Sequence, residues 1–157
     1  MAVNNAAIIL ICIFAFSSTL ALRKPIEFSK CEKESKSVIA SVDMEPFVQD
    51  AKGRLIFYRG TNVTATIKFT PEVEVTKATV HLYAILFGEK MELEVPHRNA
   101  CEDHNIKCPL DPKTEYTMIG EIEVMKRLPP LPLTVQLDVE LPNNEYLYCF
   151  QTQVHLK

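Results

Sequence analysis

Residues Asn99–Leu110 read NACEDHNIKCPL and contain two cysteines, Cys101 and Cys108, with six residues between them. A proline follows the second cysteine, and on both sides the chain alternates apolar and polar residues as a β-strand does. A short polar loop that a cysteine pair closes between strands is typical of small exported β-proteins. The stretch therefore predicts a disulfide-closed connection in an all-β domain.

Alternation with period two recurs along most of the chain, and it is clearest in Leu133–Leu141, where five aliphatic side chains share one face. Prolines, glycines and the Pro142-Asn143-Asn144 turn separate the segments. The expected strands are Ser37–Asp43, Arg54–Arg59, Val63–Thr70, Lys77–Phe87, Lys90–Val95, Glu115–Met125, Leu133–Leu141 and Tyr146–Leu156. Seven or eight short strands predict an antiparallel β-sandwich. Its apolar faces could form either a packed core or, if the sheets splay, a cavity.

The first 21 residues, Met1–Ala21, have no charged side chain and end in Thr-Leu-Ala after an apolar run. This pattern predicts a secretory signal peptide cleaved after Ala21, which leaves Leu22–Lys157 as a single domain. The alternative is an uncleaved membrane anchor, but the apolar run is shorter than the ~20 residues that a span needs. With 17 basic and 20 acidic residues and no basic stripe, a nucleic-acid partner is not expected.

Four cysteines remain once Cys12 leaves with the signal peptide, and an even number in an exported chain predicts two disulfides. Three pairings are possible. Cys101–Cys108 is favoured because closing a short loop costs little entropy. Cys31–Cys149 is then left, and in the chain-entropy model its long loop contributes roughly 4–5 kcal/mol.

Some residues could in principle form a metal site or an enzyme site. A zinc site could be drawn from Cys101, Cys108, His97 and His104. The cysteine spacing is wide for such a site and an oxidising compartment favours disulfides, so no metal is expected. His104 is then predicted to be a solvated loop residue. No cysteine is left as a free nucleophile, and no G-x-S-x-G motif accompanies a histidine. Some carboxylates could pair as acid and base, but they lie on outward strand faces, where charge aids solubility: Asp138, Glu140, Glu121 and Glu123. The chain is predicted to be neither an enzyme nor a cofactor-binding protein.

Two further segments bear on function. Asn62-Val63-Thr64 is an N-x-T sequon, which predicts glycosylation of Asn62 in an exported protein. Leu128–Leu133 (LPPLPL) is too rich in proline for a central strand. It is either a stiff connection with buried leucines or an apolar rim at a pocket mouth, which proline holds in shape.

Several of these features occur together in one known family. Cys31 near the start, VHLYAILFG at Val80–Gly88, ACEDHNIKCPL at Ala100–Leu110 and YLYCF at Tyr146–Phe150 resemble the ML lipid-recognition domain family. The resemblance runs from about Phe28 to Leu156. It implies an immunoglobulin-like β-sandwich whose sheets part to enclose an apolar cavity. Cys31–Cys149 and Cys101–Cys108 match two of the family's three disulfides. The third would fall in Met44–Arg59, which has no cysteine.

The resemblance also implies a function and a binding site. The function is that of a soluble, monomeric carrier of a sterol, a fatty acid or another hydrophobic molecule such as a semiochemical. Such a carrier exchanges its ligand with a donor or acceptor membrane or with a membrane receptor. Leu93 falls where relatives have a pocket aromatic residue, and Val124 and Leu128 (or Pro130) match other contact positions. The further expected lining residues are Ile67, Phe69, Val80, Leu82, Phe87, Met91 and Phe150.

An alternative of a different class remains open. The same fold could be an extracellular immune-recognition module that acts through its surface or through lipid A-like ligands. The expected location is extracellular, with the lysosomal lumen as the alternative.

Overall fold

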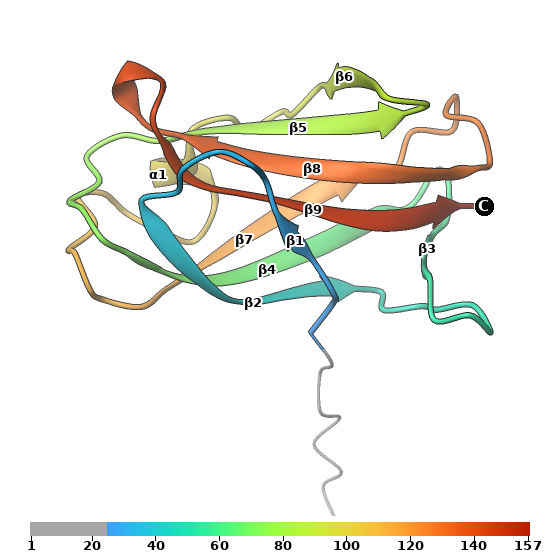
Figure 1. Ribbon diagram of the computed structural model, residues 1–157, viewed down its shortest axis with the longest axis horizontal. Coiled ribbons are helices and arrows are strands. Elements are labelled where there is room, and N and C mark those ends of the chain that lie inside the picture. Colours follow the sequence, from blue (N-terminus) through green and yellow to red (C-terminus); the bar gives the residue numbers. More distant parts are fainter. Residues whose placement is uncertain (1–24) are drawn as a thin grey trace, which may run out of the picture.

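Two stacked β-sheets contain all the strands of residues 25–157, the part of the chain that the computed structural model describes (Figure 1). The large sheet has the order β1-β9-β8-β5-β6, with β3 also paired to β9, and the small sheet has the order β2-β4-β7. The strands are β1 (Ser29–Lys30), β2 (Ser37–Glu45), β3 (Leu55–Phe57), β4 (Asn62–Pro71), β5 (Thr79–Leu86), β6 (Glu89–Leu93), β7 (Tyr116–Glu123), β8 (Pro132–Glu140) and β9 (Tyr146–Leu156). The predicted all-β sandwich is therefore confirmed. The expected signal peptide, Met1–Ala21, lies outside the described residues.

The strand pairing departs from the prediction at one edge. The predicted strand Arg54–Arg59 is shortened to β3, and it runs parallel to β9, with Leu55 opposite Val154 and Phe57 opposite Leu156. The other strand pairs of the two sheets are antiparallel, as predicted, and the pairing of β3 with β9 is the exception among the described strands. The connection from β2 crosses from the small sheet to the large one, so β3 joins the last strand in the same direction. Strand β1, which also pairs with β9, has only two residues, too few for a pattern that the sequence could show.

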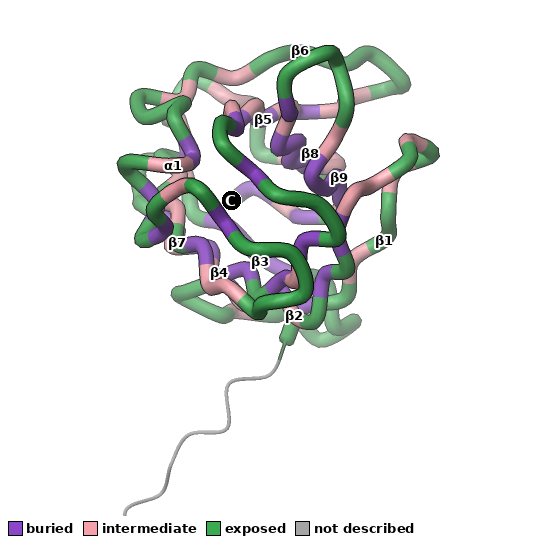
Figure 2. Tube along the Cα trace, turned by 90° about the vertical axis from the view of Figure 1, so that its left-hand side faces the viewer, coloured by how far each residue is buried: buried purple, intermediate pink, exposed green. Residues whose placement is uncertain are grey.

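The core lies between the sheets, where buried residues face each other (Figure 2). Alternation in β4 places Val63, Ala65, Ile67 and Phe69 inward, and none of them is more than 1% exposed. Across the space, the Phe69 ring stands 5.0 Å from the Tyr148 ring of β9, centroid to centroid. Each large apolar side chain buried in this way contributes roughly 1.5–3 kcal/mol.

A carboxylate organises the segment Met44–Arg59, where the third family disulfide is absent. Asp50 Oδ1 accepts hydrogen bonds from the main-chain N–H groups of Lys52 (2.8 Å) and Arg54 (3.0 Å). Asp50 Oδ2 accepts a third from Nε of Arg54 at 2.6 Å. Gly53, with φ of 77°, completes the turn because only glycine adopts this backbone conformation without strain. A charged cap thus closes this turn.

The loop Asn99–Leu110 contains one helical turn, α1 (Ala100–Asp103), which Asn99 caps through a bond from the Cys101 N–H to its side-chain oxygen. The structure has the disulfides Cys101–Cys108 and Cys31–Cys149, as expected. The prediction that His104 is solvated is wrong, since it is 6% exposed. Its ring nitrogens lie 3.1 Å from the Ile119 carbonyl oxygen and 2.8 Å from that of His97. The loop folds back over β7 and buries the ring there.

Among the described residues, no helix is long and apolar enough to cross a membrane.

Candidate ligand-binding site

The inner faces of the two sheets bring most of the predicted lining residues together. Five of them lie in the middle of the sandwich and are at most 4% exposed: Ile67, Phe69, Val80, Leu82 and Phe150. Val124, directly after β7, is also 4% exposed. They come from both sheets, because period two turns alternate side chains of each strand toward the facing layer.

The edge strands β6 and β7 have apolar side chains of intermediate burial. Leu93 of β6 pairs with Leu82, and Ile122 of β7 pairs with Val63, so both point toward the inner layer. Both are half-buried, as are Leu128 and Leu131 in the connection between β7 and β8. Apolar surface therefore continues from the buried centre to the edge of the sandwich. In the Leu128–Leu133 segment, Leu133 is buried and Leu128 and Leu131 are half-buried, which fits either of its two interpretations.

Two predicted lining residues are placed differently. Phe87 is 91% exposed, because it occupies the β5–β6 turn with a φ of 52° and points into solvent. Its assignment to the pocket wall is wrong. Met91 pairs with the buried Ala84, so its side chain is on the inner face, but it is 44% exposed because β6 is an edge strand. Met91 belongs to the rim rather than to the centre.

The hollows of the surface lie elsewhere. One, of about 650 Å³, is lined by the segment Pro25–Ser29, the Lys52–Leu55 turn and polar residues of β9. Another, of about 530 Å³, lies beside the Cys101–Cys108 disulfide. None of the predicted lining residues borders either of them. Between the sheets, the apolar side chains pack against one another, as the tilted Phe69 and Tyr148 rings do.

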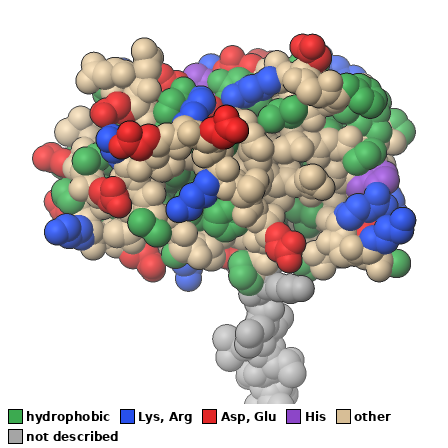
Figure 3. Space-filling model, in the orientation of Figure 1, with side chains coloured by type: hydrophobic (Ala, Val, Ile, Leu, Met, Phe, Trp, Pro, Cys, Tyr) green, Lys and Arg blue, Asp and Glu red, His purple; other side chains and the backbone are tan. Residues whose placement is uncertain are grey.

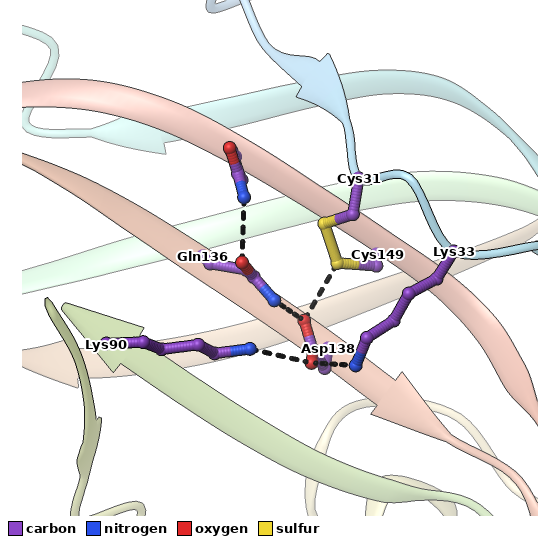
Figure 4. The surroundings of a disulfide bond; sticks show 7 residues. Cys31, Lys33, Lys90, Gln136, Asp138 and Cys149 are labelled. Carbon is purple, nitrogen blue, oxygen red and sulfur yellow. Dashed lines mark hydrogen bonds and ion pairs between the residues drawn. A yellow bond between two sulfur atoms is a disulfide. The ribbon is translucent and has the colours of Figure 1, made fainter. Parts of the chain in front are cut away.

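The outer face of the large sheet has a polar cluster that the sequence interpretation missed (Figure 4). Asp138 was expected to be a solubilising surface charge, but it is 1% exposed. Its Oδ2 lies 3.2 Å from Nζ of Lys33 and 3.6 Å from Nζ of Lys90, and its Oδ1 accepts a bond from Nε2 of Gln136 at 2.7 Å. The Cys31–Cys149 disulfide covers the group. Only the pairing of β8 with β9 places Asp138 opposite Cys149, so no sequence signal could have found the cluster.

The two lysines of this cluster are also held by aromatic rings. Nζ of Lys33 lies 3.7 Å from the ring centroid of Tyr146, and Nζ of Lys90 lies 3.7 Å from that of Tyr83. Burial opposes the charged form of Lys33, but its contacts with Tyr146 and Asp138 prevail and raise the pKa of this ammonium group. Each cation therefore joins a carboxylate and an aromatic ring across the sheet.

Cys31, Asp138 and Cys149 place three ligand-type atoms within 4.8 Å of one another. Both sulfur atoms belong to a disulfide, so neither is the thiolate that a metal ion requires. The cluster is therefore structural and offers no metal site.

Buried polar groups between the sheets are few. The hydroxyl of Tyr148 donates to Sδ of Met118 at 2.9 Å, and complete burial raises the pKa of this phenol. A neutral phenol bonded to a thioether has no role in acid–base chemistry near neutral pH. Apolar side chains therefore dominate the space between the sheets among the described residues.

The sequon residue Asn62 is exposed at the start of β4. Its side-chain amide donates to Oε1 of Glu121 on the neighbouring β7. The amide nitrogen thus lies at the surface of the small sheet. Glycosylation of Asn62 stays a prediction.

The fold defines a class of protein, the two-sheet β-sandwich whose apolar inner faces extend to the edge strands. A family model described as the ML domain matches residues 25–156, and the chain belongs to this family. The resemblance read from the sequence is thereby confirmed.

Curated relatives and solved structures agree with this assignment. The NPC intracellular cholesterol transporter 2 of Mus musculus is 23% identical over 151 residues, which cover 96% of this chain and 95% of the relative. The protein of the same name from Danio rerio is 25% identical and covers 84% of this chain and 85% of its own length. A Niemann-Pick type C2 protein from the Japanese carpenter ant superposes with a TM-score of 0.75 at 19% identity, over 84% of this chain and all of the ant chain. At this identity the superposition shows the fold alone.

Proposed function

We propose that this chain is a secreted lipid carrier that holds a sterol, a fatty acid or a similar hydrophobic molecule between its two sheets. One observation carries the proposal: the facing sides of the sheets are almost entirely apolar, from the buried centre at Phe69 to the half-buried edge at Leu93. The curated relatives, which are named as cholesterol transporters, support it.

The energetics suit such a ligand. Transfer of a 16-carbon chain out of water is worth on the order of 0.8 kcal/mol per CH₂, or roughly 13 kcal/mol in total. Immobilising the ligand and rearranging side chains offset much of this. Because the sheets are in contact through rings such as Phe69 and Tyr148, entry of a ligand requires these side chains to separate. Leu93 of β6 and Leu128 after β7 keep part of their apolar surface exposed at the edge of the sandwich, so the ligand enters between these two edge strands.

A carrier also has to exchange its ligand, and the exposed Phe87 suits contact with a membrane. Ile85 pairs with Thr134, so the β5–β6 turn lies beside the segment that contains Leu128 and Leu131. Figure 3 shows hydrophobic side chains gathered at the upper right of the visible face, where this turn lies, with a group of Lys and Arg side chains directly below them. A donor or acceptor bilayer that receives the Phe87 ring is therefore brought next to the entry edge.

The chain is processed before it acts as a carrier. Met1–Ala21 directs export and is removed, Leu22–Lys157 acts as one monomeric domain outside the cell, and Asn62 carries a glycan. The protein is a carrier and not an enzyme, which fits the family to which it belongs.

The test is ligand displacement with delipidated protein. Secreted protein is stripped of lipid and loaded with a fluorescent fatty acid or a fluorescent sterol, and unlabelled ligand is then added. We expect displacement of at least one probe at micromolar protein, and co-purified lipid in native mass spectra of the untreated sample. No displacement of either probe, together with lipid-free native spectra, would overturn the proposal.

A further inference from the structure

One charged side chain lies beside the predicted binding site and has no assigned role. Arg59 lies in the connection between β3 and β4, where its main-chain N–H donates to the Lys157 carbonyl at 2.8 Å. Its Nη1 donates to the carbonyl oxygens of Leu128 at 3.2 Å and Lys126 at 3.5 Å. The next residue, Gly60, donates its N–H to the carbonyl of Val124. The guanidinium group is thus held next to two of the positions expected to contact the ligand.

The hydrogen bonds of this guanidinium group are incomplete. Nε of Arg59 is buried and has no hydrogen-bond partner among the residues that the structure describes. None of the ion pairs among residues 25–157 includes Arg59. A buried N–H without an acceptor is costly, and a guanidinium fork suits a carboxylate better than any other group. Both the missing acceptor and the missing counter-charge could be supplied by an anionic ligand.

We infer that Arg59 binds the acidic head group of the ligand, which makes long-chain carboxylic acids the preferred class. This inference rests on the proposed carrier function. The alkyl chain lies between the sheets, past Val124 and Leu128, and the carboxylate accepts the Nε–H bond. The two carbonyl bonds of Nη1 hold the guanidinium group beside the Leu128 turn, and Nε–H is left for the head group. A neutral alcohol or sterol gains the same apolar burial but does not neutralise the charge.

The experiment compares two ligands of equal chain length. Hexadecanoic acid and 1-hexadecanol each displace a neutral fluorescent probe from the full-length mature protein at about pH 8, where the carboxyl group is ionised. We expect the acid to bind at least about tenfold more tightly than the alcohol, since a charge-assisted bond is worth this much. In Arg59→Gln, the affinity for the acid falls to that for the alcohol, while the affinity for the alcohol changes little. Arg127→Gln is the matched control, because it removes an equal charge from an exposed residue of the same turn and leaves the preference intact.

The outcomes separate a binding role from a structural one. If Arg59→Gln weakens the acid and the alcohol equally, Arg59 only positions the Leu128 turn, and the inference is wrong. If the wild-type protein binds both ligands with equal affinity, the inference is also wrong, while the carrier function stands. If it binds neither, the carrier function itself fails. The wild-type comparison of acid and alcohol needs no variant, so it tests the inference even if Arg59→Gln does not fold. Arg59→Lys keeps the charge and should retain part of the preference for the acid.

Discussion

The carboxylate of Asp138 lies against the sulfur of Cys149, with Oδ1 2.8 Å from Sγ, and both residues are 1% exposed. The contact joins the disulfide at the start of the domain to the centre of the large sheet (Figure 4). Lys33, two residues after Cys31, and Lys90 on the edge strand β6 both pair with the same carboxylate. Asp138 therefore ties the N-terminal segment and β6 to β8.

The first prediction concerns this charge. Asp138→Asn keeps the shape of the side chain but leaves Lys33 and Lys90 without their common counter-ion. Breaking a buried ion pair costs about 3–5 kcal/mol, and because both lysines are 36% exposed we expect a smaller loss of about 2 kcal/mol in the free energy of unfolding. Urea denaturation of the oxidised protein measures it. Glu123→Gln, at an exposed position of β7, is the control, and an equal effect of the two changes would contradict the prediction.

The second prediction concerns the Asp50 turn and its dependence on pH. Hydrogen bonds from the main chain and side chain of Arg54 lower the pKa of Asp50 from 3.8 to about 2, despite partial desolvation. A lowered pKa in the folded state means that Asp50 stabilises the turn above about pH 4, and that this contribution is lost as the pH falls through about 2. Titration of the Asp50 carboxyl carbon by NMR measures the pKa directly.

The same turn can be examined with a protease. In Asp50→Asn the charged cap is lost, so trypsin at neutral pH should cleave after Lys52 and Arg54 several times faster than in the wild-type protein. Asp111→Asn serves as the control in another exposed turn. Equal rates of cleavage in all three proteins would show that Asp50 does not hold the segment.

The third prediction tests the entry edge. Leu93→Trp fills the inner side of β6, where the half-buried leucine has room at its exposed edge. We expect affinity for fatty acid and sterol probes to fall by at least about tenfold through steric exclusion. Because Leu93 is only half-buried, the loss of stability should be below the roughly 1–3 kcal/mol of overpacking in a core. Glu94→Trp adds the same side chain at the next, exposed residue and should leave binding unaltered. Unchanged affinity in Leu93→Trp would place the ligand elsewhere.

The fourth prediction separates membrane contact from ligand affinity. Phe87→Ser should slow transfer of a fluorescent ligand to phospholipid vesicles by about tenfold, since one aromatic ring no longer enters the bilayer. Equilibrium affinity in solution should stay the same, because Phe87 does not face the space between the sheets. Val38→Ser, 52% exposed on the small sheet, is the control. Equal transfer rates in both variants and the wild-type protein would refute the role of Phe87.

The fifth prediction ranks the disulfides. In the chain-entropy model, closing the 118-residue separation between Cys31 and Cys149 contributes about 5 kcal/mol, and closing the 7-residue separation between Cys101 and Cys108 contributes about 2 kcal/mol. The double serine variant of the first pair should therefore lose more of the free energy of unfolding in guanidinium chloride. The reverse order would show that local packing of the α1 loop outweighs the entropy of closure.

Much of the fold could be predicted because it depends on local pattern. Alternation placed the inner residues of β4 and β8 correctly, since the side-chain period of a strand is two whatever its neighbours are. The parallel pairing of β3 was not predictable, because three residues have no signal for the direction in which they join a sheet. Phe87 was misplaced for a similar reason: an apolar run continues to the turn, and only the backbone at the turn decides that this ring points outward.

By itself, the sequence determined the all-β class, the positions of most strands and the apolar character of the inner faces, because these follow from side-chain periodicity. The motifs at Val80–Gly88, Ala100–Leu110 and Tyr146–Phe150 carried the resemblance to the family. The tertiary structure alone decided which groups meet across strands far apart in the chain. It buried Asp138 beneath the Cys31–Cys149 disulfide, placed His104 between two carbonyl oxygens, and left a buried N–H of Arg59 without an acceptor beside Leu128. Polar groups are satisfied or left unpaired by neighbours in space, and those neighbours are set by strand register and loop packing rather than by local pattern.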